Sequence, residues 1–262
     1  MKKLLTLALS SAILVSVVGC SSSKDDNKIV IGASSTPHAE ILEVIKPQLE
    51  KEGYKLEIKV FDDYPLENTA LEEGSIDANY FQHVPYLEET VASTGYKLTY
   101  TEKIHLEPMG LYSNSLKSIN EIKDGATIAI PNDPTNGARA LKLLANEGLI
   151  KVKEGELIGA KDITENPKNI KVKELAAEQL TSVLTEVDAA VINTNYALSA
   201  NLNPTKDAII IESKDSPYAN ILAVKEENKD SEKIKALSKA LTSKEVKEFI
   251  EKQYKGSIIP SF

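Results

Sequence analysis

Residues 28–61, KIVIGASSTPHAEILEVIKPQLEKEGYKLEIKVF, decide the fold class of this chain. Lys28–Ala33 is a short apolar run, which is typical of a buried strand. Apolar residues then recur four apart from Ile41 to Leu49, which predicts a helix. Lys55–Phe61 alternates apolar and polar residues, which predicts a second strand. A strand, a helix and a strand in this order indicate an α/β protein.

The same alternation continues along the chain. Pro47 falls inside the first predicted helix, and we expect it to kink or break that helix because proline lacks the backbone N–H. The pattern restarts after Pro108, which suggests two lobes, each with a mostly parallel sheet flanked by helices. Further strands are predicted at Ile76–Tyr80, Lys97–Ile104, Ala126–Ile130, Ile170–Val172, Asp188–Ile192, Ala208–Ile211 and Ile221–Val224, and helices at Leu66–Glu73, Val84–Ser93, Thr135–Glu147, Ala176–Leu184 and twice near the C-terminus.

We expect one lobe to contain residues 28–107 and 219–262, and the other to contain residues 108–218. The chain would then cross between the lobes twice, near Glu107–Gly110 and near Asp215–Asn220. Both stretches carry a proline and separate successive strand signals. Two crossovers of this kind would form a hinge.

Composition excludes several classes of protein. The 262 residues are 42% hydrophobic and 27% charged, which is ordinary for a globular protein and argues against a disordered or fibrous one. The formal net charge of −8 argues against a nucleic-acid binder, which needs a basic face. The single cysteine, Cys20, excludes an intramolecular disulfide and a thiolate metal cluster.

The N-terminus has the pattern of a secretory leader. Lys2 and Lys3 precede an apolar run from Leu4 to Val18 that is short for a membrane span. Small residues lead into Cys20, as in a lipobox, where the cysteine is lipidated; the alternative is an ordinary leader with an incidental cysteine. We therefore expect a signal peptide at 1–19, a lipidated polar tether at 20–27 and a domain held by acyl chains on the extracytoplasmic face of the cell membrane.

Motifs for catalysis are missing from the sequence. It contains no GxSxG elbow, no P-loop and no GxGxxG after a predicted strand. His38, His83 and His105 are far apart, and no serine stands in a nucleophile-like context. We therefore expect no enzyme, no cofactor and no metal, although three histidines and a carboxylate leave a metal-binding lipoprotein as the alternative.

Arg139 is the one arginine among 31 basic residues. It lies in PTNGARAL (Pro134–Leu141), near the start of a predicted helix. A guanidinium can grip a carboxylate with two parallel hydrogen bonds, and the N-terminus of a helix favours an anion. Arg139 is therefore a candidate for binding a carboxylate in a cleft; the alternative is a surface arginine.

An aromatic cluster occupies DANYFQHVPYL (Asp77–Leu87), where Tyr80, Phe81, His83 and Tyr86 lie within seven residues. It follows a predicted strand, and ligands of α/β sheets bind at the carboxyl ends of strands. Such an aromatic wall suits a thioether, because sulfur packs well at ring edges. The alternative is a set of ordinary core aromatics.

Asn193 and Asn195, in VINTNYA, follow another predicted strand. Two amides at a strand end suit the amino and carboxylate groups of a ligand. Turn-forming asparagines are the alternative.

Together, DANYFQHVPYL, PTNGARAL, VINTNYA, SPYANILAV and the closing YKGSIIPSF resemble the NlpA lipoprotein family, the methionine-binding lipoproteins of bacterial ABC importers. The similarity runs from about Lys28 to Phe262. It implies a two-lobed clamp of the periplasmic-binding-protein type (type II) that closes on methionine. It also implies delivery to a permease driven by a cytoplasmic ATPase, with the protein acting as a monomer.

The resemblance implies a role for each residue that matches a family motif. Arg139 would hold the α-carboxylate with help from Asn136, and Asn193 would contact the α-amino or carboxylate group. The family usually reads Asp-Tyr-Val-x-Pro-Asn where this chain has DYPLEN (Asp63–Asn68), and His38 matches a family position at a helix start. The methionine side chain would be lined by Tyr64, Phe81, His83 and Tyr86, and Asn68 would have a role near them.

The resemblance favours L-methionine as the ligand. D-methionine, a methionine sulfoxide and a short methionine-containing peptide such as glycyl-methionine carry similar groups, so they stay open as alternatives.

Overall fold

The computed structural model describes residues 27–262. The leader expected at 1–19, Cys20 and the tether up to residue 26 lie outside the described residues. Between Asn27 and Phe262, no helix is both long and apolar enough to cross a bilayer.

The first lobe is built on a six-stranded sheet with the order β13-β4-β12-β3-β1-β2. Strand β1 pairs in parallel with β2 and β3, whereas β12 pairs antiparallel with β3 and β4, and β13 pairs antiparallel with β4. The bounds are β1 Lys28–Ala33, β2 Lys55–Val60, β3 Ala78–His83, β4 Leu98–Leu106, β12 Ala219–Lys225 and β13 Ile259–Pro260.

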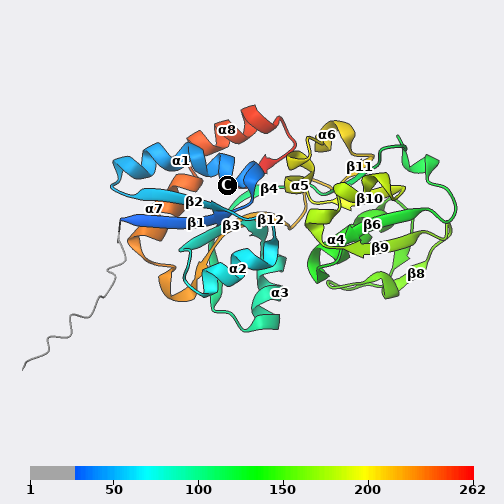
Figure 1. The fold of residues 1–262 in the computed structure, drawn as a ribbon, viewed down its shortest axis with the longest axis horizontal. Coiled ribbons are helices and arrows are strands. Elements are labelled where there is room, and N and C mark those ends of the chain that lie inside the picture. Colours follow the sequence, from blue (N-terminus) through cyan, green and yellow to red (C-terminus); the bar gives the residue numbers. More distant parts are fainter. Residues whose placement is uncertain (1–26) are drawn as a thin grey trace, which may run out of the picture.

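Helices cover both faces of this sheet (Figure 1). One face packs against α1, α7 and α8, with Ile41, Ile45 and Leu49 of α1 fully buried or nearly so. The other face packs against α2 and α3 through Leu71 and Leu87. The bounds are α1 Glu40–Lys51, α2 Tyr64–Glu72, α3 Val84–Thr94, α7 Glu232–Leu241 and α8 Lys244–Tyr254.

Pro47 lies inside α1 without ending it. The expected break of the helix at Pro47 does not occur. Proline removes one backbone hydrogen bond, but the apolar stripe of α1 continues on both sides of Pro47 and holds the last turn against the sheet.

The second lobe contains a five-stranded sheet with the order β11-β5-β10-β6-β9 and a small β7–β8 hairpin. Helix α4 packs on one face, while α5 and two 3₁₀ turns at Ala177–Gln179 and Ser182–Thr185 pack on the other. These two turns replace the helix expected at 176–184. The bounds are β5 Gly110–Tyr112, β6 Thr127–Pro131, β7 Lys151–Val152, β8 Ile163–Glu165, β9 Lys171–Leu175, β10 Ala189–Ile192, β11 Ile210–Ile211, α4 Pro134–Asn146, α5 Thr194–Ser199 and α6 Pro204–Asp207.

Both sheets are mixed rather than mostly parallel. The reason lies in the path of the chain, which leaves the first sheet after β4 and returns to it in β12. Strand β12 begins beside the end of β4, with Ala219 paired to Leu106, so it runs antiparallel to β4 and also to β3, its other neighbour. The chain thus crosses between the two sheets twice, at residues 107–109 and at residues 212–218.

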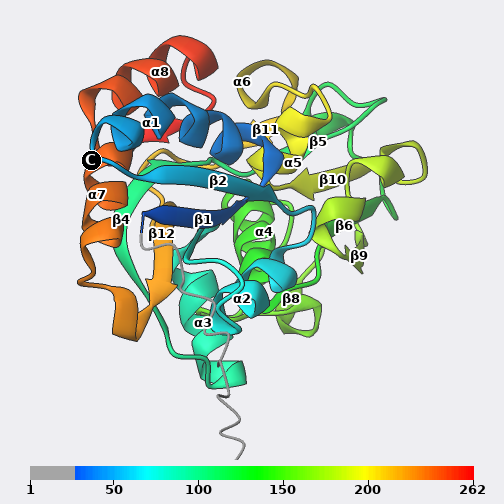
Figure 2. The same cartoon turned by 60° about the vertical axis from the view of Figure 1, so that its left-hand side comes forward.

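The two lobes are in contact across their boundary. Helix α3 of the first lobe contacts α4 of the second, and both views place them side by side (Figures 1 and 2). Tyr64 and Phe81 of the first lobe belong to one apolar cluster with Leu180 and Ile192 of the second. The structure is therefore a closed form of the molecule.

Candidate functional site

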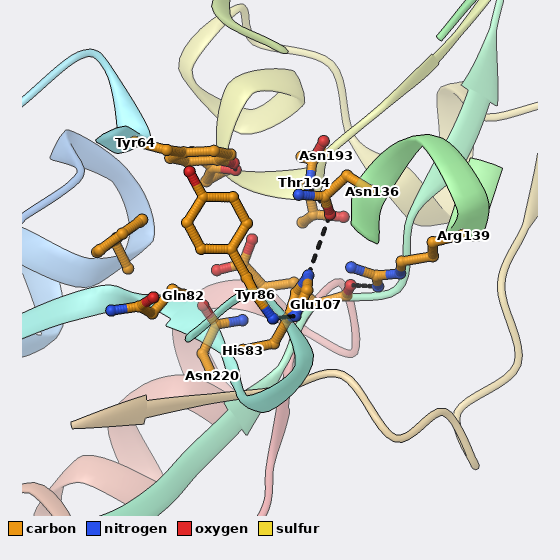
Figure 3. Close-up of a pocket in the computed structure, with 12 residues that line it drawn as sticks. Tyr64, Gln82, His83, Tyr86, Glu107, Asn136, Arg139, Asn193, Thr194 and Asn220 are labelled. Carbon is orange, nitrogen blue, oxygen red and sulfur yellow. Dashed lines mark hydrogen bonds between the residues drawn. The ribbon is translucent and has the colours of Figure 1, made fainter. Parts of the chain in front are cut away.

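A pocket lies between the lobes (Figure 3). The first lobe supplies side chains from α2, from the end of β3 and from the start of α3, and the second lobe supplies them from α4 and α5. Seven of the eight ligand-binding residues predicted from the sequence line it: Tyr64, Phe81, His83, Tyr86, Asn136, Arg139 and Asn193.

Asn68 is the exception. Its amide is 1% exposed and bonds to Gln82 and Asn79, below the surface of the pocket. Asn68 therefore supports β3, and Gln82, its partner, reaches the pocket in its place.

The aromatic wall is formed by three elements that meet. The ring of Tyr64 lies 5.4 Å from that of Phe81 and 5.8 Å from that of Tyr86. Asp63 caps α2 through the backbone N–H of Leu66, so the altered DYPLEN stretch still begins a helix and still directs Tyr64 to the pocket. Offset and edge-on rings at these distances stabilise one another and leave an apolar surface facing the ligand.

Hydrogen bonds around His83 fix the protonation of its ring. The Nδ1 atom accepts from the backbone N–H of Tyr86, so Nε2 carries the proton and donates to Oδ1 of Asn136 at 3.1 Å. Burial, together with the charge of Arg139, lowers the pKa of His83 to about 3, so the ring is neutral. His83 therefore joins the two lobes as a hydrogen-bond donor.

The same Asn136 oxygen also accepts from Nδ2 of Asn193 at 2.9 Å. Asn136 in turn donates to Asp133, the N-cap of α4. The other side-chain atom of Asn193, Oδ1, is buried and has no hydrogen-bond partner among the described residues. A buried acceptor without a partner is costly, so this atom marks a place for a donor from a ligand.

Arg139 enters the pocket from the first turns of α4, 4% exposed. Its Nε and Nη2 atoms donate to the Glu212 carboxylate at 2.9 and 2.5 Å, and Nη2 also donates to the carbonyl oxygen of Glu107 at 2.7 Å. The ring of Tyr218 lies 4.4 Å from the guanidinium carbon. The arginine is therefore buried and paired, not a surface residue.

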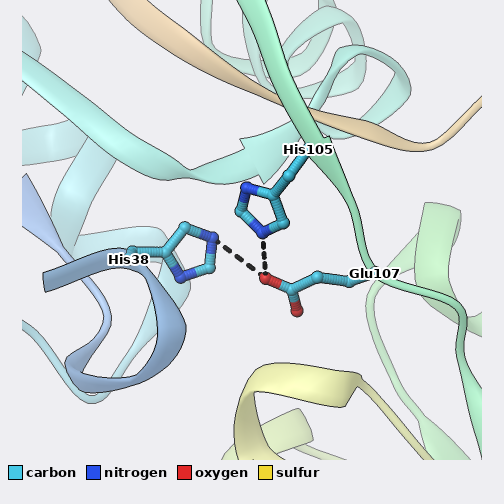
Figure 4. Close-up of side chains that lie close together, drawn as sticks. All are labelled: His38, His105 and Glu107. Atoms are coloured by element: carbon cyan, nitrogen blue, oxygen red, sulfur yellow. Dashed lines mark hydrogen bonds and ion pairs between the residues drawn. The ribbon is translucent and has the colours of Figure 1, made fainter. Parts of the chain in front are cut away.

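Glu107 lies at the pocket on the first crossover, and two histidines lie next to its carboxylate (Figure 4). Its Oε1 atom lies 2.7 Å from Nε2 of His105 and 3.2 Å from Nε2 of His38. Burial lowers the pKa of His105 to about 3 and that of His38 to about 4, so both rings are neutral. Nε2 of His105 donates to the carboxylate, whereas Nε2 of His38 forms its hydrogen bond with Oδ1 of Asn220. Burial raises the pKa of Glu107, and the positive charge of Arg139 acts against that rise.

His38 lies in the turn at Ser35–Ala39 that leads into α1, fully buried. The sequence analysis placed it at a helix start, and it does lie there. It reaches the ligand site only indirectly, through Glu107 and through Oδ1 of Asn220 at 3.1 Å.

Sequence reasoning missed several residues that line the pocket. Asn220 belongs to the SPYANILAV motif, whose polar residue within an apolar strand was an available signal. It lies at an irregular position of β12, where the register shifts. Glu107 gave no signal, being one acidic residue among 39. The missed lining residues are Gln82, Glu107, Thr194 and Asn220, whereas Asn195, the second amide of VINTNYA, lines the pocket as that motif suggested.

Comparison with known proteins agrees with this site. The family model described as NlpA lipoprotein matches residues 29–262. The methionine-binding lipoprotein MetQ of Bacillus subtilis is 45% identical, over 99% of both chains. The D-methionine-binding lipoprotein MetQ of Escherichia coli K12 is 42% identical, over 98% of both chains.

Solved structures show the same fold. A nutrient-binding protein from Burkholderia cenocepacia, bound to methionine, superposes with a TM-score of 0.87 at 49% identity, covering 89% of this chain and all of that one. The match covers nearly the whole described structure, so the similarity extends over both lobes. This chain belongs to the NlpA lipoprotein family.

Proposed function

We propose that this chain captures methionine between its lobes and delivers it to the permease of an ABC importer. The observation that carries the proposal is the pocket itself, in which an aromatic wall faces a buried arginine and an unpartnered amide oxygen. An amino acid with a thioether side chain offers a match to each part. The names of the relatives, and the methionine bound to one of them, support the same ligand.

The hydrogen bonds already made suggest how the ligand lies. Nη1 of Arg139 makes no hydrogen bond to another described residue, which leaves it for the α-carboxylate. The free Oδ1 of Asn193 suits the α-ammonium group, because it can only accept. The thioether would then lie against Tyr64, Phe81 and Tyr86, where sulfur packs at ring edges.

The remaining parts of the proposal concern the whole protein. We place the lobe boundaries near Glu107–Gly110 and Asp215–Asn220, with the lobes closing about these two crossovers. Lipidation at Cys20 would hold the protein on the extracytoplasmic face of the cell membrane, beside the permease and its ATPase. No step in this proposal requires catalysis by the chain.

The direct test is native mass spectrometry of the gently purified protein, followed by calorimetry after the protein has been unfolded and refolded to remove bound ligand. We expect a retained mass equal to methionine and tight binding of L-methionine, with D-methionine, methionine sulfoxide and glycyl-methionine measured beside it. Binding of the dipeptide in preference to every free amino acid would replace methionine as the ligand. Failure to bind any of the four would overturn the proposal.

The second candidate function is metal binding, and the cluster of His38, His105 and Glu107 is the observation that favours it. The spacing argues against it. Two ligands of one tetrahedral zinc ion lie about 3.4 Å apart, whereas His105 Nε2 and Glu107 Oε1 lie 2.7 Å apart, as in a hydrogen bond. Elemental analysis that found one transition metal per chain would reverse this ranking.

A further inference from the structure

Glu212 stands just outside the pocket, where the two crossovers lie side by side. It follows β11 directly, and its backbone N–H donates to the carbonyl of Met109 on the first crossover at 2.8 Å. Its side chain, 13% exposed, also accepts from the backbone N–H of Met109 at 3.3 Å. Glu212 is therefore tied to both segments that connect the lobes.

The Glu212 carboxylate occupies the Nε–Nη2 edge of the Arg139 guanidinium. This edge could otherwise donate two parallel hydrogen bonds to a ligand. One oxygen accepts from Nε and the other from Nη2. The second hydrogen of Nη2 goes to the Glu107 carbonyl on the first crossover, and Tyr218 on the second crossover covers one face of the group. Three of the five N–H groups of the guanidinium are thus used, and those left belong to Nη1.

We infer that Glu212 is a positioning residue that aims Nη1 of Arg139 at the carboxylate of the ligand. The inference rests on the proposed function and adds a residue that does not line the pocket. A guanidinium on a flexible stem loses conformational entropy when it binds. Because Glu212 and both crossovers hold the group before the ligand arrives, binding does not have to bear that loss. Glu212 also balances the charge of the buried arginine.

A double-mutant cycle separates positioning from a general structural role. Affinity for L-methionine is measured by calorimetry on the full-length protein in detergent, for the unmodified chain, Glu212→Gln, Arg139→Lys and the double variant. We expect Glu212→Gln to weaken binding about tenfold, the scale of a lost charge-assisted hydrogen bond. We expect the double variant to bind within about twofold of Arg139→Lys alone, because lysine has no Nη1 group for Glu212 to position.

Asp77→Asn is the matched control. Asp77 forms a partly buried ion pair with Lys233 at 2.7 Å and also accepts a backbone N–H, from Val30, but it does not line the pocket between the lobes. This variant should lower the midpoint of unfolding as Glu212→Gln does, yet leave the affinity for L-methionine unchanged. Glu212→Asp gives a second measurement if Glu212→Gln does not fold, because it keeps the charge and shortens the reach by one methylene. It should also weaken binding.

The outcomes are distinct. Effects of Glu212→Gln and Arg139→Lys that simply multiply, or unchanged affinity in both Glu212 variants, would overturn the inference while leaving the proposed function intact. Failure of the unmodified protein to bind L-methionine would instead remove the proposed function.

Discussion

At the scale of single residues, Arg139 illustrates why lysine is not an equivalent of arginine. A lysine ammonium is a point charge with three donors, whereas the guanidinium presents donors along a rigid plane. In this structure the plane is used on several sides at once, by Glu212, by the Glu107 carbonyl and by the Tyr218 ring. A chain that uses lysine for its 30 other basic residues thus keeps its one arginine at a place where shape matters.

Arg139→Lys should weaken the binding of L-methionine by about 1.5–3 kcal/mol, the contribution of a hydrogen bond to a charged group. The charge is kept and the fork is lost, so the variant tests geometry and not net charge. Titration calorimetry at constant pH and salt measures the change. Unchanged affinity would mean that Arg139 does not contact the ligand.

Glu67 is a residue for which burial decides the charge. It lies on α2 with no exposed surface, and both carboxyl oxygens lack hydrogen-bond partners among the described residues. Burial therefore raises the pKa of Glu67 well above its usual value. The folded state holds the proton on Glu67 at a pH at which the unfolded state has released it.

This difference gives Glu67 a pH-dependent cost. As pH rises above the unfolded pKa, about 4.3, the unfolded state loses its proton first, so the free energy of unfolding falls until pH reaches the folded pKa. Glu67→Gln removes the titration, and the variant should gain stability over the unmodified chain between pH 4 and pH 7. Urea unfolding at several pH values measures this gain. Glu73→Gln, at the exposed C-cap of the same helix, is the control and should show no such gain.

At the scale of elements, β3 shows where sequence reasoning stops. The strand was expected at 76–80, whereas it runs over Ala78–His83 and is buried throughout. Its polar side chains are buried because they bond to one another and to α2: Gln82 bonds to Asn79 and Asn68. Hydropathy alone does not reveal these partners, because Asn68 lies 14 positions before Gln82 in the sequence.

The other missed elements are too short for periodicity to act as a signal. Strands β7 and β13 have two residues each, and they exist because a neighbouring strand offers free backbone groups. The long strands and helices were predictable, since their apolar faces repeat over several residues. The pocket was predictable where a motif carried it, as at His83 or Arg139, and not where a lone residue such as Glu107 is brought in by the fold.

Gly137 fixes how closely α4 approaches β6. A Cβ atom added there would lie 2.9 Å from the carbonyl oxygen of Pro131, a backbone atom that cannot move aside alone. Gly137→Ala should therefore push the start of α4 outward and lower the free energy of unfolding by about 1–3 kcal/mol, as overpacking does.

Because Asn136 and Arg139 flank Gly137 on α4, the same variant should also weaken methionine binding. Thermal unfolding and calorimetry measure the two effects. Gly159→Ala, where an added Cβ meets no atom within 4 Å, is the control. Equal behaviour of the two variants would show that the approach of α4 to β6 is not limiting.

At the scale of the whole molecule, the lobes are held together by bonds as well as by apolar contact. Tyr64 donates to Oδ1 of Asn195 at 2.6 Å, and Tyr196 donates to the carbonyl of Asp62 at 2.9 Å. Each bond joins a residue of the first lobe to one of α5. Closure is thus fixed at the rim of the pocket, beside the aromatic wall.

Cys20→Ser should abolish retention of the protein on membranes and leave the affinity for L-methionine unchanged. The residue precedes β1 by a polar segment, whereas the pocket begins at Tyr64. Stable retention needs two or more acyl chains, because a single chain binds a bilayer only marginally. Fractionation of cells and calorimetry on the soluble variant measure the two quantities. Retention equal to that of the unmodified chain would mean that another feature anchors the protein.

The bonds among His83, Asn136 and Asn193 have one more consequence. Nε2 of His83 donates to Oδ1 of Asn136 across the lobe boundary, and Nδ2 of Asn193 donates to the same oxygen. A molecule that enters between these groups competes with the bonds among them, so a contact that replaces one of these bonds yields only the difference between two bonds, about 1 kcal/mol or less. A molecule that replaces every bond is admitted, whereas one that replaces half of them leaves buried groups stranded. The affinity should therefore fall more steeply for molecules that replace only some of these bonds than the number of lost contacts alone would predict.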